Sequence, residues 1–172
     1  MAGMELVILS GLQASGKSTF AAERFAVTHA HVSKDRLRNN AKPERRQRQL
    51  VAEALAAGRS VVVDNTNPTA EDRAPLIALG HEHGARVVGY YFTSSVKGSL
   101  ARNARREGRA RVPDVAIFAT RKRLAPPSYA EGFDALYAVR IMDEDGGGGE
   151  SESEDAKRFE VSDWREEEWA DG

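Results

Sequence analysis

The strongest evidence for the fold lies in Glu5-Leu-Val-Ile-Leu-Ser-Gly-Leu-Gln-Ala-Ser-Gly-Lys-Ser18. It begins with a short, nearly continuous apolar run, which is typical of a strand buried on both faces of a parallel sheet. The run stops at Gly11, and from Lys17 onward apolar and small residues recur at helical spacing, namely Phe20, Ala21, Phe25 and Ala26. The sequence therefore predicts a strand, a glycine-rich turn and a helix, in that order.

The turn fits the pattern G-x-x-x-x-G-K-[ST] at every defined position. In such a P-loop, backbone N–H groups surround phosphate oxygens at the positive end of a helix. Lys17 is expected to place its charge beside the β and γ phosphates of ATP, and the Ser18 hydroxyl to ligate Mg²⁺. We therefore expect ATP and Mg²⁺ as cofactors. The predicted nucleotide-binding residues of the loop are Gly11, Ser15, Gly16, Lys17, Ser18 and Thr19.

Strands and helices alternate along the rest of the chain to residue 142. Further strands are expected over residues 29–33, 60–64, 86–93 and 137–142, and helices over about 43–57, 70–83, 96–107 and 114–124. This alternation predicts an α/β fold with a parallel sheet of about five strands, right-handed crossovers and helices on both faces. An arginine-rich connection over residues 109–113 is expected to form a lid. Ligands should lie at the carboxyl ends of the strands.

Charge divides the chain after residue 142. Residues 1–142 carry 22 Lys and Arg against 13 Asp and Glu, whereas residues 143–172 carry 3 against 13. We expect the first part to be one domain. The second part is rich in Gly, Glu and Ser and is expected to be a largely disordered acidic tail, in which Trp164 and Trp169 either dock or stay mobile. A basic domain attracts polyanions, although solvated helix faces explain the same charge.

Composition also bears on the compartment. The chain has no cysteine, and no apolar run approaches the roughly 18 residues of a membrane helix. Its N-terminus lacks the basic segment of a secretory signal. We therefore expect a cytoplasmic protein without disulfides or a membrane partner. The sequence leaves homo-oligomer formation open.

Carboxylates follow two of the predicted strands. Asp64 is expected to hold hydrated Mg²⁺, with capping of the next segment as the alternative. Asp35 can accept the proton of an attacking hydroxyl group. Arg38 lies three residues later on the same face and can bind a phosphate beside that hydroxyl. The alternative for this segment is a plain helix start, capped by Ser33.

Arginines gather before the expected lid. Arg102 and Arg106 are four residues apart on one predicted helix, so they should share a face and can neutralise a transferring phosphoryl group together. Three further arginines are explained at least as well by a basic surface, namely Arg105, Arg109 and Arg111.

Together these residues resemble the polynucleotide 5′-kinase domains of bacteriophage and bacterial end-healing enzymes and of animal polynucleotide kinase-phosphatases. The resemblance spans about residues 5–140. The elements that carry it are Gly11–Ser18, Asp35-x-x-Arg38, Val63-Asp-Asn-Thr-Asn-Pro68 with Arg73, the group Arg102-Asn103 and Arg106 followed by Val112-Pro113, and Ala130-Glu-Gly-Phe133.

The resemblance implies a P-loop kinase-like fold and an ATP-dependent kinase for the 5′-hydroxyl end of DNA or RNA, acting in repair or end processing. It assigns ATP and Mg²⁺ to Lys17 and Ser18, general-base catalysis to Asp35, and the acceptor phosphate to Arg38. By the same resemblance, the arginines that contact the ATP phosphates are Arg102 and Arg106.

The chain also departs from the family pattern. Many relatives are fused to a phosphatase, a ligase or another repair module. We recognise no such second domain in this sequence and therefore expect a stand-alone kinase. Two other functions stay open: a phosphotransferase for a small-molecule hydroxyl of a nucleoside, sugar or antibiotic, and a non-enzymatic, ATP-controlled nucleic-acid-binding module. The acidic tail is expected to contact the basic face of its own domain, in competition with nucleic acid, or to recruit a protein partner.

Overall fold

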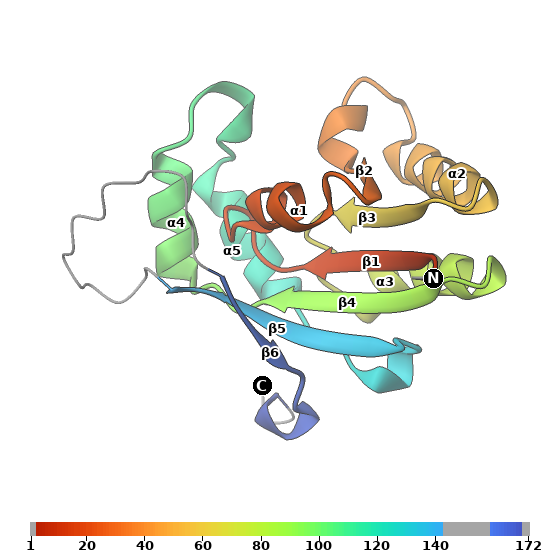
Figure 1. Ribbon diagram of the computed structural model, residues 1–172. Coiled ribbons are helices and arrows are strands. Elements are labelled where there is room, and N and C mark those ends of the chain that lie inside the picture. Colours follow the sequence, from red (N-terminus) through yellow and green to blue (C-terminus); the bar gives the residue numbers. More distant parts are fainter. Residues whose placement is uncertain (1–2, 143–158, 170–172) are drawn as a thin grey trace.

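The computed structural model describes residues 3–142 and 159–169, which form one mostly parallel sheet with helices on both faces (Figure 1). The strands are β1 (Glu5–Ser10), β2 (His29–Val32), β3 (Ser60–Asp64), β4 (Arg86–Phe92), β5 (Ala135–Ile141) and β6 (Phe159–Asp163). The helices are α1 (Lys17–Phe25), α2 (Pro43–Ala56), α3 (Ala70–Glu82), α4 (Val96–Ala104) and α5 (Asp114–Arg123). The strand order is β2-β3-β1-β4-β5-β6, and the first five are parallel, which confirms the predicted α/β class.

The apolar run of β1 is buried on both faces, as its sequence predicts. On one face it contacts a layer made with α1, whose inward residues are Phe20, Ala21 and Phe25. On the other face it contacts a layer made with α2 and α3, whose inward residues include Val51, Leu55, Leu76 and Ile77. Alternate β1 side chains therefore enter different layers, which fixes the strand in the centre of the sheet.

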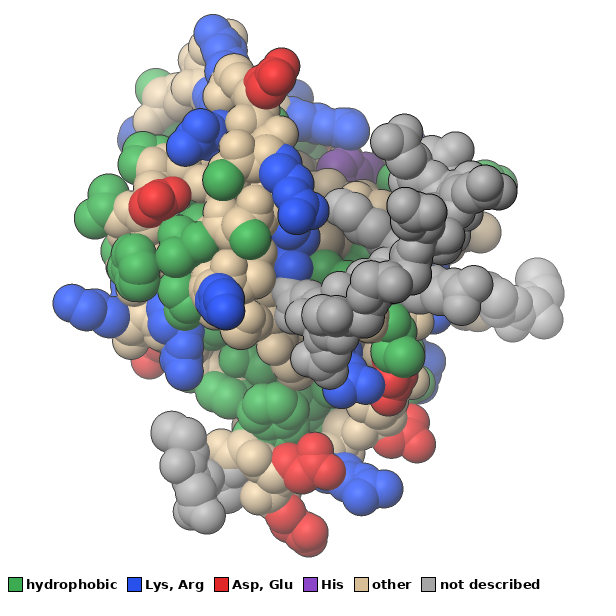
Figure 2. Space-filling model, turned by 90° about the vertical axis from the view of Figure 1, so that its left-hand side faces the viewer, with side chains coloured by type: hydrophobic (Ala, Val, Ile, Leu, Met, Phe, Trp, Pro, Cys, Tyr) green, Lys and Arg blue, Asp and Glu red, His purple; other side chains and the backbone are tan. Residues whose placement is uncertain are grey.

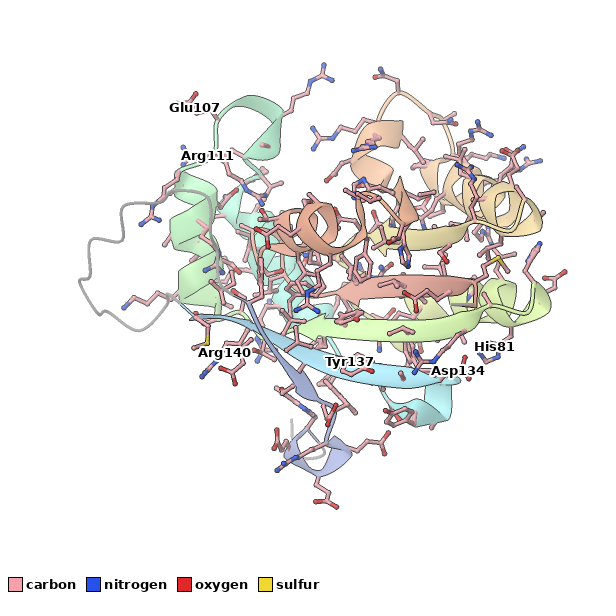
Figure 3. All side chains as sticks on the ribbon, viewed as in Figure 1. His81, Glu107, Arg111, Asp134, Tyr137 and Arg140 are labelled. Atoms are coloured by element: carbon pink, nitrogen blue, oxygen red, sulfur yellow. The ribbon has the colours of Figure 1, made fainter. Side chains whose placement is uncertain are left out.

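The two ends of the sheet carry different groups. At the carboxyl ends of the parallel strands lie the P-loop and the lid, where Figure 3 labels Glu107 and Arg111. At the opposite end, His81 and Asp134 form an ion pair of 3.3 Å between Nε2 and Oδ2 (Figure 3). The sheet thus gathers the predicted site residues at the end where open α/β sheets bind ligands.

Helix α4 is shorter than predicted. It ends at Ala104, and a 3-10 turn over Gly108–Ala110 follows. The side chain of Asn103 holds the segment between α4 and α5 in place. Its amide donates to the Val112 carbonyl (2.7 Å), and its oxygen accepts from the Val112 N–H (3.0 Å). These two bonds bring the far end of the lid back to α4.

The C-terminal region differs from the expected tail. Residues Phe159–Asp163 form β6, antiparallel to β5, and Trp164 is only 8% exposed and stacks on Trp169 at 5.4 Å. Residues 159–169 therefore add a sixth strand to the expected sheet of about five and pack against the domain that was expected to end at residue 142. The physical reason is visible in Phe-Glu-Val-Ser-Asp, an alternation typical of a half-buried strand, which the acidic composition around it obscured. The rest of the expected tail lies outside the described residues.

Within residues 3–142 and 159–169, no helix is both long and apolar enough to cross a membrane.

Candidate functional site

The P-loop needs glycine at two positions. Gly11 has a φ of +150°, and a Cβ there would lie 2.8 Å from the Cβ of Phe92. Gly16 has a φ of +90° and precedes α1, whose first turn carries no acidic residue and no side-chain cap. The first N–H groups of α1 are therefore available to an anion, as phosphate binding requires.

Lys17 is buried inside this loop. Its Nζ donates to the Gly11 carbonyl (3.0 Å), the Leu12 carbonyl and the Ser15 hydroxyl (3.2 Å). The pKa of Lys17 is lowered to about 8, chiefly by burial and in smaller part by the charge of Arg106, while the carboxylates of Asp64 and Asp35 oppose the shift. The loop thus holds an amine whose charge a phosphate would stabilise.

Ser18 and Asp64 offer a pair of oxygen ligands. The Ser18 hydroxyl donates to Oδ2 of Asp64 at 2.7 Å, and His31 Nε2 lies 2.9 Å from the same oxygen. Burial alone would raise the pKa of Asp64, but the hydrogen bonds from His31 and Ser18 and the charge of Lys17 hold it below its usual value. An ionised carboxylate beside a hydroxyl fits a hard cation such as Mg²⁺.

The segment predicted to hold the acceptor is a 3-10 turn over Lys34–Leu37. Ser33 caps it by accepting from the Asp35 N–H at 3.3 Å, so the capping alternative is also present. The Asp35 side chain is 83% exposed and lies 3.5 Å from a guanidinium nitrogen of Arg38. The backbone N–H of Lys34 donates to Asn65 Oδ1 at 2.8 Å, which ties this turn to the end of β3.

One cavity joins the two sides. It has a volume of about 470 Å³ and opens between the P-loop, the 3-10 turn, the end of β3 and the lid. Seven of the predicted site residues line it: Ser15, Lys17 and Ser18 on the loop side, Asp64 in the centre, and Asp35, Arg38 and Arg106 around the mouth. The sequence motifs therefore converge on one space.

The two arginines predicted to share a helical face do not share one. Because α4 ends at Ala104, Arg106 lies beyond the helix and lines the cavity. Arg102 remains on α4 and donates to the Ala14 carbonyl of the P-loop and to the Ser94 hydroxyl. The prediction of a shared face is therefore wrong. Thr19, also predicted to bind nucleotide, lies half-buried in the first turn of α1.

Arg73, which the sequence analysis named without giving it a role, stabilises the start of the P-loop. Arg73 is fully buried and pairs with Glu131 through bonds of 2.8 and 3.1 Å. It also donates to the Asn67 carbonyl at 2.9 Å, and the Asn67 side chain donates to the Leu9 carbonyl at 2.7 Å. The turn after β3 is thereby locked to the end of β1, where the P-loop starts.

Sequence reasoning gave no role to Lys34, Asn65 and Thr66, which line the cavity, or to His31, which contacts Asp64. Each lies within two residues of a predicted strand end, which was the signal available. What the sequence lacked was the pairing of β2 with β3, which brings these strand ends together.

Comparison with known proteins identifies relatives of this chain. A family model described as an AAA domain matches residues 6–127. The bifunctional polynucleotide phosphatase/kinase of Schizosaccharomyces pombe is 31% identical over 139 residues, which are 78% of this chain and 33% of that protein. The chain spans about a third of the length of the curated relatives that it matches.

Solved structures share the fold. A chain of the Pnkp1/Rnl/Hen1 RNA repair complex aligns with a TM-score of 0.62 at 23% identity, over 72% of this chain and 45% of that one. A gluconokinase from Sinorhizobium meliloti aligns with a TM-score of 0.57 at 18% identity, over 81% and 84%. The resemblance to polynucleotide kinases drawn from the motifs is confirmed by the curated match, and the chain belongs to the AAA domain family, with a P-loop kinase fold.

Proposed function

We propose that this domain transfers the γ-phosphate of ATP to the 5′-hydroxyl end of a DNA or RNA strand, as in nucleic-acid repair or end processing. The observation that carries the proposal is the placement of Asp35 and Arg38 across one cavity from Lys17 and the Ser18–Asp64 pair. Such a placement gives a hydroxyl acceptor and a phosphate donor the in-line approach that phosphoryl transfer needs.

On the donor side, Lys17 and the first N–H groups of α1 would hold the β and γ phosphates. Ser18 and Asp64 would hold Mg²⁺, directly or through water, and the bound ion supplies charge neutralisation at the phosphates. Arg106, at the cavity wall, is placed to meet charge that develops on the transferred group. Arg102 would act on the loop that it already contacts through Ala14.

On the acceptor side, Asp35 would take the proton of the attacking 5′-hydroxyl, and Arg38 would bind the neighbouring phosphate of the strand. The carboxylate is exposed and lies 3.5 Å from a guanidinium nitrogen of Arg38, so an incoming hydroxyl has access to it. Positioning and electrostatic stabilisation would supply most of the catalysis.

Charge favours a polymeric acceptor over a small molecule. Residues 34–48 carry seven Lys and Arg against two acidic residues, and residues 102–111 carry five against one. The rest of residues 1–142 carries ten basic and ten acidic residues, so the whole excess lies in these two segments. They meet where an Arg38 nitrogen donates to the Arg109 carbonyl at 3.2 Å. Figure 2 shows Lys and Arg side chains gathered toward the lid, with few acidic ones among them.

A sugar or nucleoside hydroxyl does not need such a field, whereas the phosphates of a strand do. The test is an acceptor panel with wild-type protein and Mg²⁺: 5′-hydroxyl and 5′-phosphorylated oligonucleotides of DNA and RNA, free nucleosides, and sugars such as gluconate. We expect transfer to the 5′-hydroxyl oligonucleotides alone. Transfer to a nucleoside or a sugar, with none to the oligonucleotides, would move the function to a small-molecule kinase.

We also propose that the acidic segment of residues 143–158 competes with nucleic acid for these basic surfaces. This segment has seven acidic and two basic residues. The residues on either side of it are held beside the P-loop, because a Cβ on Gly16 would lie 3.2 Å from Ile141 and 3.0 Å from Phe159. A tethered polyanion acts at a high effective concentration on a nearby basic surface.

A further inference from the structure

We propose that a groove at the start of α2 binds phosphates of the acceptor strand several nucleotides downstream of the reacting 5′-end. The residues that line the groove are Asn40, Ala41, Lys42, Arg45, Arg46 and Gln49. The proposal rests on the proposed function, because it names the path by which the strand leaves the cavity. It adds a binding site that none of the sequence motifs includes.

The groove follows the Asp35–Arg38 side of the cavity along the chain. Arg38 lines the cavity, and the groove begins two residues later at Asn40. Its volume is about 350 Å³, and its lining holds three basic residues, three uncharged residues and no acidic one. A strand whose 5′-end lies at Asp35 and whose first phosphate lies at Arg38 would meet this groove next.

Within the part of the chain that the structure describes, the basic side chains of the groove lack carboxylate partners. Elsewhere arginines have carboxylate partners, as in the pairs Arg123–Asp72 and Arg140–Glu160. Among residues 3–142 and 159–169, no ion pair involves Lys42, Arg45 or Arg46. The one carboxylate between them in sequence, Glu44, lies 3.7 Å from Lys34. Unpaired cations on an exposed helix start suit a polyanion that releases counterions on binding.

The span of chain between Arg38 and Lys42 limits how long an acceptor must be to reach the groove. Lys42 follows Arg38 by four residues, which span at most about 14 Å when extended. Stacked nucleotides rise by about 3.4 Å each along a strand. An acceptor longer than roughly four nucleotides is therefore long enough to pass Arg38 and lie in the groove, and we expect shorter acceptors to gain least from it.

The test compares two double variants that each remove two positive charges. R45Q/R46Q changes the groove, and R59Q/R86Q changes exposed arginines at the amino ends of β3 and β4. Equilibrium binding of a fluorescent 5′-hydroxyl single-stranded 12-mer is followed by anisotropy over a range of salt concentrations. An unlabelled 4-mer is measured by competition.

We expect R45Q/R46Q to bind the 12-mer roughly tenfold more weakly than wild type and to reduce the slope of log K against log salt by about 1.4, since each phosphate contact contributes about 0.7. R59Q/R86Q should match wild type, and the 4-mer should bind all three proteins alike. Three results would each overturn the proposed site: equal losses of 12-mer affinity in both variants, an equal loss of 4-mer affinity in R45Q/R46Q, or no binding of the 12-mer by wild type. Because the readout is binding, a failure of phosphate transfer would count against the proposed function and not against this site.

Discussion

The ionisation of Lys17 links nucleotide binding to pH. Its pKa of about 8 in the empty loop results first from burial, and a phosphate beside it must raise that pKa, since it stabilises the charged amine. Above pH 8 the free protein therefore carries mostly neutral Lys17, and binding must add a proton. We predict that affinity for MgADP falls as pH rises through about 8.

Calorimetry in buffers of different ionisation enthalpy measures that proton directly. At pH 8.5 we expect uptake of most of one proton per MgADP bound, and near pH 6.5 almost none. No uptake at pH 8.5 would show that Lys17 is already charged in the empty loop.

Arg73 stabilises the turn after β3 through its buried bonds to Glu131 and to the Asn67 carbonyl. Removing it in R73A leaves Glu131 without its buried cation and takes away one of the two donors to the Asn67 carbonyl, the other being the Ser10 hydroxyl. We predict a loss of about 3–5 kcal/mol in the free energy of unfolding, as for other broken buried pairs. The matched control is R123A, which breaks the exposed pair with Asp72 and should cost at most about 1 kcal/mol. Urea unfolding measures both, and equal effects would contradict the account.

Strand β6 packs against the P-loop and the start of α1 through Phe159. Phe159 packs edge-on against Phe20 at 5.3 Å, and its ring lies 3.0 Å from where a Cβ of Gly16 would be. We predict that F159A lowers stability by about 2–3 kcal/mol and weakens MgADP binding several-fold, because the loop loses its support. E160A, on the same strand, breaks only a surface ion pair with Arg140 and should change neither quantity much. An F159A protein that binds MgADP like wild type would contradict the supporting role of β6.

The elements also show what could be predicted from sequence. The central strands β1, β3 and β4 and the helix α1 have strong local signals, because long apolar runs and glycine turns report burial directly. The end of α4 was misplaced by its arginine-rich continuation, which has good helix propensity. In the structure the bonds of Asn103 with Val112 turn the chain there, and that contact spans nine residues. Local helix propensity does not report this contact between Asn103 and Val112.

For the molecule as a whole, the acidic segment should modulate nucleic-acid binding without supporting the fold. We predict that replacing the seven Asp and Glu of residues 143–158 by Asn and Gln raises affinity for a 12-mer several-fold at low salt and leaves it unchanged at high salt. The thermal midpoint should stay constant, whereas a truncation at residue 142 should lower it, since it also removes Trp164 from the core. Unchanged affinity at low salt would discard the competition.

The candidate site was predictable to the extent that its parts lie in motifs. Lys17, Ser18, Asp35, Arg38 and Asp64 were all named from short patterns, and a common cavity brings them together. The supporting contacts were not predictable, because His31, Asn65 and Arg73 act through strands and turns 30 or more residues away in the chain or through a pairing that only the folded sheet creates. Charge along the chain pointed to a polyanion, but only the fold places the two basic segments around one mouth.

In the proposed reaction, Asp35 accepts the proton of a 5′-hydroxyl while the P-loop holds ATP. The most direct measurement is transfer of label from γ-³²P-ATP to a 5′-hydroxyl 12-mer under single-turnover conditions by wild type, D35N and the exposed-carboxylate control E53Q, with MgADP affinity measured for each. We predict labelled ends with wild type and E53Q, and a rate at least about 100-fold lower with D35N at unchanged MgADP affinity. Label transfer by D35N at the wild-type rate, or no transfer by any of the three, would contradict the account.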